Sequence, residues 1–410
     1  MSTNVNDSSS LLLDSLDKSS WKSYRFEEIA KNISERVDPN NTELTVYIGL
    51  EHLDSNSIHI KRRGTPDDVN GQKLKFYKGD IIFGRRRAYL RKAGIAETDG
   101  FCSAHALVLR ANPEVISPKL FPFFMHSNSF MHKAVDISVG SLSPTINWGT
   151  LKTQEFLVPP KTIQLQLVSL FETLDIVRCK ENSFTEKLKD YATVKARELL
   201  LGGFLNEEGT KYKNMQPIPK SWEIKPLHEL FDKISKKNKD NISSNVLTIS
   251  AKDGLVNQEK YFNKSVASKD LSNYFLLSSG DFAYNKSYSD GYPAGAIKRL
   301  KNYEKGVVSP LYICLKAKCS QHLAKYYEYL FESGFLNQQI LAVAKEGARN
   351  HGLLNVAIDD FFNLKVPVPT EALTLRILNE LSKLDTTNEI HQTQLENSNR
   401  LQDCIVNKVF

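Results

Sequence analysis

The stretch that decides the fold runs from Lys161 to Leu201 and reads KTIQLQLVSLFETLDIVRCKENSFTEKLKDYATVKARELLL. Its apolar positions recur in steps of four and three, which is the spacing of one narrow stripe along a helix. The stripe consists of Ile163, Leu167, Leu170, Leu174, Val177, Phe184, Leu188 and Tyr191. About 40 residues at roughly 1.5 Å rise predict a rod of about 60 Å. The first glycines after it, Gly202 and Gly203, predict where the helix ends.

A stripe this narrow is best buried against another long helix, and the sequence offers one from Glu371 to Phe410. Polar residues fall on its stripe at Asn388, His391 and Ser398, as they would if the helix fixes its register with them or is partly solvated. We expect an antiparallel pair. The predicted seam consists of Leu167, Leu170, Leu174, Val177, Phe184 and Leu188 on the first helix and Ile377, Leu381, Leu384, Leu395 and Ile405 on the second.

Length and composition predict a soluble protein of two or three domains. The chain has 410 residues, of which 41% are hydrophobic and 25% charged. No apolar run approaches the roughly 20 residues of a membrane span. The Ser-rich residues 1–20 lack the core of an export signal, so a mobile tail is expected. The five cysteines are dispersed, which favours reduced thiols, a cytoplasmic location and no metal site.

The chain also repeats one ordered series of motifs. Trp21 matches Trp222 at a shift of 201 residues, and residues 78–81 (KGDI) match residues 279–282 (SGDF) at the same shift. Farther along, the shift grows to 208, where residues 156–159 (FLVP) match residues 364–367 (LKVP). Because the series keeps its order while the shift drifts slowly, it indicates a duplication.

Each copy is expected to contain the same elements in the same order. We expect helices at 26–33 and 227–234, strands at 44–50 and 245–250, strands at 81–84 and 282–285, helices at 119–127 and 322–333, and strands at 156–158 and 364–366. The fold class predicted is α+β: two duplicated mixed α/β domains separated by an antiparallel coiled coil of two long helices, with pseudo-two-fold symmetry. The predicted boundaries are a tail at 1–20, domains at 21–159 and 222–368, long helices at 160–203 and 369–410, and a linker at 204–221.

A catalytic apparatus is missing from the sequence. There is no GxxxxGK[ST] loop for ATP, no GxGxxG after a strand, no HExxH, and no Asn-Pro-Pro-aromatic tetrapeptide of adenine methyltransferases. Asp80 and Asp281 recur in Gly-Asp turns, where we expect their carboxylates to cap the backbone. The chain is therefore predicted to be a recognition module without catalytic residues, although an enzyme with an unrecognised site remains an alternative.

Several motifs together resemble the specificity subunits of type I restriction-modification systems. They are Trp21 with its helix, residues 47–51 (YIGLE), 78–85 (KGDIIFGR) and 156–160 (FLVPP), and the helix opening at 164–168 (QLQLV). The resemblance implies that each domain reads one half of a bipartite DNA site and that the helices set the spacer between the halves. It also implies two methyltransferase subunits that bind S-adenosylmethionine and two restriction subunits that use ATP and Mg, whereas this chain would have no cofactor or catalysis of its own.

Candidate DNA-binding residues come from a basic segment and from its counterparts in the second copy. Residues 57–95 contain eleven Lys or Arg and three acids, a local field that attracts a polyanion. In the first domain the candidates are Lys61, Arg62, Arg63, Arg85, Arg86, Arg87, Tyr89, Arg91, Lys92, Ser141, Ser143, Thr145 and Asn147. In the second they are Lys286, Tyr288, Tyr292, Lys298, Arg299, Lys301, Arg349, Asn350 and His351. If residues 85–87 continue the strand, Arg85 and Arg87 share one face. A stand-alone double-headed DNA- or protein-binding module would carry the same features.

Overall fold

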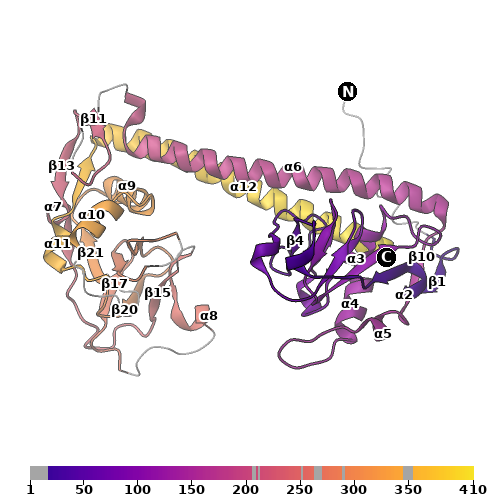
Figure 1. Ribbon diagram of the computed structural model, residues 1–410. Helices are drawn as coiled ribbons and strands as arrows, with labels where there is room; N and C mark the ends of the chain where they lie inside the picture. The colour runs from indigo at the N-terminus through magenta and orange to yellow at the C-terminus, as the bar shows by residue number, and fades with distance from the viewer. Residues whose placement is uncertain are drawn as a thin grey trace, which may run out of the picture. The chain divides into compact units, whose positions relative to one another are not determined.

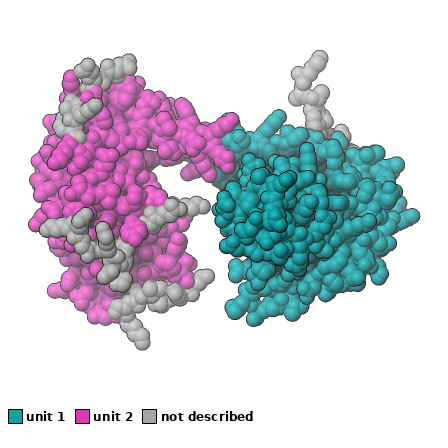
Figure 2. Space-filling model, viewed as in Figure 1, with its two compact units in different colours: residues 1–185, 391–410 teal, residues 186–390 magenta. Residues whose placement is uncertain are grey.

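The computed structural model describes residues 17–205, 209–210, 213–250, 253–262, 270–288, 291–344 and 354–410. Most of the predicted tail lies outside these residues. The chain forms two compact units, residues 1–185 with 391–410 and residues 186–390 (Figure 2). Each long helix is divided between the two units, so the predicted domain boundaries stay a prediction.

The first unit is built on two four-stranded sheets. One has the order β2 (Ala30–Ile33), β9 (Ala106–Ala111), β6 (Ile81–Gly84), β7 (Ala93–Ile95), with every neighbour antiparallel. The other has the order β3 (Arg36–Val37), β5 (Lys73–Phe76), β8 (Gly100–Cys102), β4 (Tyr47–Ile48), and here β4 and β8 are parallel. A separate pair joins β1 (Lys22–Arg25) to β10 (Glu155–Val158). The short helices are α2 (Phe26–Ile29), η1 (Pro39–Asn41), η2 (Pro66–Asp68), η3 (Ala88–Leu90), α3 (Phe121–His126), α4 (Asn128–Asp136) and α5 (Trp148–Leu151).

An aromatic cluster forms the core of this unit. The ring of Phe26 lies 5.4 Å from that of Phe130, and the ring of Phe124 lies 5.3 Å from that of Phe156, measured between centroids. All four side chains are buried. They join α2, α3, α4 and β10, which are labelled in Figure 1, and they pack these elements against the sheet that contains β6.

The second unit repeats this plan. Its four-stranded antiparallel sheet has the order β14 (Phe231–Lys233), β21 (Ile313–Ala317), β18 (Phe282–Asn285), β19 (Ala296–Arg299). Two-stranded pairs join β13 (Glu223–Pro226) to β22 (Lys365–Val368), β15 (Leu247–Ser250) to β16 (Gly254–Asn257), β17 (Phe275–Ser278) to β20 (Lys305–Val308), and β11 (Gly209–Thr210) to β12 (Ile218–Pro219). Its short helices are η4 (Gly203–Leu205), α7 (Leu227–Leu230), α8 (Gln258–Phe262), α9 (Gln321–Glu332), α10 (Asn337–Val343) and α11 (Ile358–Phe362).

The duplication is confirmed by one sheet in each unit. The sheet β2-β9-β6-β7 of the first unit and the sheet β14-β21-β18-β19 of the second are built in the same order from matching segments of the two copies. The shift of 201 residues, which relates the segments on either side, does not hold at the strands predicted at 44–50 and 245–250. The Phe101 amide donates to the Val46 carbonyl, and the Val307 amide donates to the Asn245 carbonyl, so the shift at this strand is 199 residues rather than 201. The loop before the strand is therefore two residues shorter in the second copy.

The Gly-Asp turns cap the backbone as predicted. The Tyr77 amide donates to Asp80 Oδ2 at 2.9 Å, and the Ser278 amide donates to Asp281 Oδ2 at 2.8 Å. The sequence did not reveal that Arg110 on β9 also donates twice to Asp80, from Nε at 2.7 Å and from Nη2 at 2.9 Å. Among the described residues of the second copy, no side chain makes such a fork to Asp281, and burial raises the pKa of its carboxyl.

Three predicted helices have different bounds. The helix at 26–33 ends at Ile29 and the helix at 227–234 ends at Leu230, because the residues that follow pair as strands β2 and β14. Non-local pairing outweighs the helical spacing there. The helix at 119–127 corresponds to α3, which begins at Phe121 and ends at His126; the hydroxyl of Ser127 then accepts from the Phe130 amide and caps the start of α4.

The two long helices are confirmed as α6 (Lys161–Leu200) and α12 (Glu371–Val409). In the first unit the beginning of α6 packs on the end of α12: the rings of Phe171 and Phe410 stack with centroids 6.2 Å apart, and Arg178 pairs with Asp403 at 3.8 Å. In the second unit Leu199 of α6 shares a core with residues near the start of α12. The pairing is therefore antiparallel. No helix in the described ranges combines the length and the apolarity that a membrane span needs.

The predicted seam on α12 corresponds to buried or half-buried positions, except that its centre is polar. On α6 the prediction holds only in part. Leu167 is buried and Leu170, Leu174 and Leu188 are half-buried, whereas Val177 is 42% exposed. Phe184 is also largely exposed, although its ring still contacts His391 at 5.0 Å. The buried row lies one residue away from the predicted stripe, at Gln164, Val168, Phe171, Thr185, Ala192 and Leu199.

Candidate nucleic-acid interface

The arginines at 85–87 lie at the end of the central strand of the first unit. Strand β6 is wholly buried and ends at Gly84, so the prediction that the strand continues and that Arg85 and Arg87 share one of its faces was wrong. Arg87 instead has a left-handed backbone, with φ of 53°, and it immediately precedes the short helix η3. Left-handed backbone is unusual outside glycine and turns the chain sharply. Arg86 and Arg87 are consequently exposed, while Arg85 is half-buried.

The loop at residues 139–147, which contains the candidates predicted between 141 and 147, docks on this turn. The Arg87 amide donates to the Pro144 carbonyl at 2.7 Å, and the Ile146 amide donates to the Arg85 carbonyl at 2.9 Å. Arg86 and Thr145 form an isolated antiparallel bridge. Ile146 is fully buried and anchors the loop, which leaves Leu142 at its tip 91% exposed. Candidate residues more than 50 positions apart thus form one surface, which we call the basic turn (residues 85–87 with 139–147).

The basic turn carries an unbalanced positive charge. Among the described residues, no acidic side chain pairs with Arg86 or Arg87, and the buried Nε of Arg85 has no hydrogen-bond partner. Burial and the nearby charges of Arg86 and Arg85 lower the pKa of His105. Tyr89, in η3, is 55% exposed beside the arginines. This combination of exposed guanidinium groups, short hydroxyl side chains and an open ring is suited to phosphate and base contacts.

Two further candidates are used inside the fold. Arg91 donates to Asn128 Oδ1 at 2.9 Å and to the His126 carbonyl, which ties η3 to α4. Lys92 donates from Nζ to the Leu50 carbonyl at 2.7 Å. Both side chains are half-buried, so their contacts account for them without a bound partner.

The three basic residues at 61–63 lie apart from the basic turn in the sequence and border a cleft. The cleft has a volume of about 480 Å³, and its walls include Val46, Phe76 and Lys61. All three bases are exposed, and Arg62 pairs with Asp54. A cleft with an apolar floor and a basic rim is able to hold a flat polar ligand, which keeps this segment among the candidates.

In the second unit the counterpart of the basic turn carries less charge. Strand β18 is followed by Lys286, whose carbonyl accepts from the Leu354 amide at 3.0 Å, just as the Arg85 carbonyl accepts from Ile146. Tyr288 is exposed. Arg349, Asn350 and His351 lie outside the described residues. The second unit thus has one lysine where the first has three arginines.

The other basic residues predicted for the interface of the second unit are paired with acidic residues of α9. Lys298 is buried and donates to Glu332 at 2.5 Å and to the Tyr292 hydroxyl at 2.9 Å. Arg299 and Lys301 lie 3.5 Å and 2.5 Å from Glu328. These contacts neutralise most of the charge that the sequence suggested. Sequence spacing could not reveal them, because the acids lie 27 to 34 residues away.

Comparisons with known proteins bear on this arrangement. No family model matches the chain. It is 29% identical over 156 residues to the type I restriction enzyme EcoDI specificity subunit of Escherichia coli. This match covers 38% of this chain and 34% of the relative. It is 22% identical over 218 residues to the type I restriction enzyme HindI specificity subunit of Haemophilus influenzae (strain ATCC 51907 / DSM 11121 / KW20 / Rd). This second match covers 49% of this chain and 48% of the relative.

The chain resembles type I specificity subunits. The resemblance predicted from the sequence is therefore confirmed, over matches that span a third to a half of those specificity subunits. The chain also shares its fold with a protein from a structural study of complex assembly and conformational transition in the type I R-M system. That likeness has a TM-score of 0.60 at 16% identity and covers 95% of this chain and 97% of the other.

Proposed function

We propose that this chain is the DNA-specificity subunit of a type I restriction-modification complex, in which each unit reads one half of a bipartite site. The observation that carries the proposal is the basic turn: three arginines at the end of strand β6, held in place by the loop at 139–147. The counterpart at Lys286 and Leu354 gives the second unit the same framework with different side chains. Two domains that read different half-sites are expected to differ there.

The chemistry of the basic turn supports contact with duplex DNA. Guanidinium groups fork to guanine O6 and N7 or to phosphate oxygens, and the docked loop offers Ser141, Ser143 and Thr145 as short donors and acceptors. Leu142 is exposed at the tip of the same loop. An apolar side chain in this position is able to contact a thymine methyl or to enter a base step.

The remaining parts of the proposal concern partners. By resemblance, the long helices set the distance between the half-sites and dock two methyltransferase subunits, with two restriction subunits joining the larger complex. S-adenosylmethionine, ATP and Mg would then bind those partners, and this chain would catalyse no step. The exposed apolar residues of α6, which include Leu165, Ile176 and Val194, are consistent with a surface that a partner covers.

The test is DNA binding by the purified chain with and without a cognate methyltransferase subunit. We expect weak, salt-dependent binding by the chain alone and sequence-specific binding by the complex, measured by fluorescence anisotropy on a cognate and a scrambled duplex. A chain that is monodisperse, binds no methyltransferase subunit and gains no specificity from it would instead be a stand-alone binding module.

A further inference from the structure

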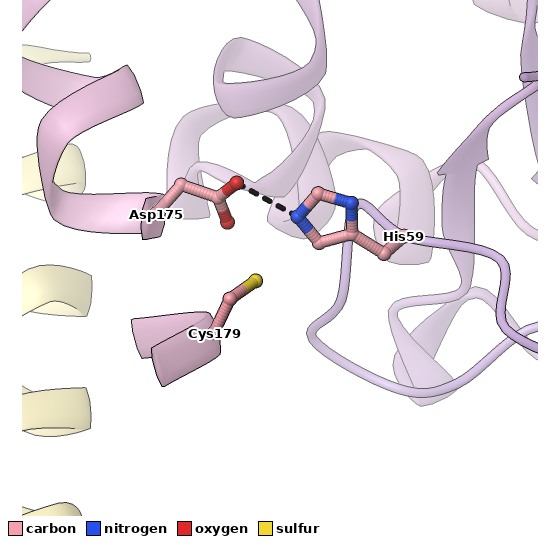
Figure 3. Close-up of side chains that lie close together, drawn as sticks. All are labelled: His59, Asp175 and Cys179. Carbon is pink, nitrogen blue, oxygen red and sulfur yellow. Dashed lines mark hydrogen bonds and ion pairs between the residues drawn. The ribbon is translucent and has the colours of Figure 1, made fainter. Parts of the chain in front are cut away.

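One side-chain cluster in the first unit is not used by the proposed interface. His59 lies in the segment just before the bases at 61–63, and Asp175 and Cys179 lie on α6 (Figure 3). Their ligand atoms all lie within 4.8 Å of one another, and His59 Nε2 is 2.7 Å from Asp175 Oδ2. Asp175 and Cys179 are four residues apart, so they project from the same face of the helix.

The donor atoms of this cluster match one class of metal ion. An imidazole nitrogen, a carboxylate oxygen and a thiolate sulfur together suit Zn²⁺, whereas Mg²⁺ and Ca²⁺ take oxygen ligands. The carboxylate and the thiolate carry two negative charges, which balance a divalent cation. Bonds of roughly 2.0 to 2.3 Å around a tetrahedral centre put donor atoms about 3.3 to 3.8 Å apart. Shifts of about 1 Å or less in the side chains would reach that geometry.

The backbone around the cluster is already fixed on both sides. The Ile95 amide of β7 donates to the Ile58 carbonyl at 2.8 Å, which holds the segment against the sheet. Arg178 of α6 donates from Nη2 to the Asn56 carbonyl at 3.0 Å, which holds the same segment against the helix. A metal would therefore bind a preorganised site. Asp175 is largely buried and His59 half-buried, while Cys179 faces solvent and gives the ion a way in.

We propose that His59, Asp175 and Cys179 form a zinc site with three protein ligands and one position left for water. Its role is structural: the ion fastens the segment that carries the bases at 61–63 to helix α6. A three-ligand site with an exposed cysteine binds more weakly than a closed four-ligand site, so zinc is expected to exchange. The inference rests on the fold of the first unit and does not depend on the proposed DNA function.

The experiment uses the full chain without a purification tag, stripped of metal with a chelator. Zinc is titrated in competition with a chromogenic chelator, and cobalt is then added as a spectroscopic substitute. We expect one metal per chain and a sulfur-to-cobalt charge-transfer absorption. His59→Gln, Asp175→Asn and Cys179→Ser should each weaken zinc binding, by on the order of 10- to 100-fold or more. Cys404→Ser, which changes another exposed cysteine, should leave it unchanged.

Two results would overturn the proposal. One is the absence of saturable zinc binding by a chain that is folded by circular dichroism. The other is equal loss of binding in Cys179→Ser and Cys404→Ser, which would show that dispersed thiols take up the metal. In either case the cluster is a hydrogen bond between His59 and Asp175 with a neighbouring cysteine.

Discussion

Replacing Arg86 and Arg87 together by alanine should reduce the salt dependence of DNA binding by a calculable amount. Both side chains are exposed, and no acidic partner holds either of them among the described residues. Each phosphate contact contributes about 0.9 to the slope of log K against log salt, so losing two lowers the slope by about 1.8. If the variant and the unmodified chain bind equally at about 1 M salt, the lower slope makes the variant bind roughly 30-fold more weakly at about 0.15 M salt.

The measurement is a salt titration by fluorescence anisotropy, with the chain bound to its methyltransferase partner. Lys301→Ala is the matched control, because Lys301 was also a candidate from the sequence but pairs with Glu328. We expect its slope to stay within about 0.3 of the unmodified chain. An unchanged slope in the Arg86/Arg87 variant, or an equal loss in the control, would refute the assignment of the basic turn.

Three further changes test which contacts stabilise the fold within each unit. Asp80→Ala leaves Arg110 and the Tyr77 amide without their acceptor; because Arg110 is partly exposed, we expect a loss of about 2 kcal/mol in the first unit by denaturant unfolding. Burial lowers the pKa of His126 to about 4, so its protonation should destabilise the fold as pH falls from about 6.5 towards 4, and His126→Gln should flatten that fall in melting temperature. Gly202→Ala, where φ is 69° and a Cβ would meet the Pro219 ring at 2.5 Å, should cost about 2 kcal/mol or more, whereas Gly149→Ala has open space and should cost nothing.

The long helices could be predicted to within three residues at each end, because apolar spacing and terminal glycine act locally along the chain. The path of the buried row on α6 could not be. Its middle positions include Asp175 and Arg178, which are engaged by His59 and Asp403. A prediction made from the apolar residues alone therefore selects the neighbouring row, in which Val177 is exposed.

The candidate interface shows the same division. The basic residues and the loop at 139–147 could each be identified from composition. Their contact could not, because it depends on a left-handed arginine, and no glycine marks that turn in the sequence. The ion pairs of Lys298 and Arg299 were also hidden, because they depend on two glutamates of a later helix. Long-range partners, rather than local propensity, decided which charges are available.

The most direct test of the account is to exchange one recognition domain, without the long helices, and read the methylated sequence. Residues 20–158 are replaced by the corresponding segment of another specificity subunit, and the methylome is sequenced in a host that expresses the chimera with its methyltransferase partner. The account predicts that one half of the bipartite motif changes while the other half and the spacer stay the same. A motif that changes in both halves, or in neither, would contradict it.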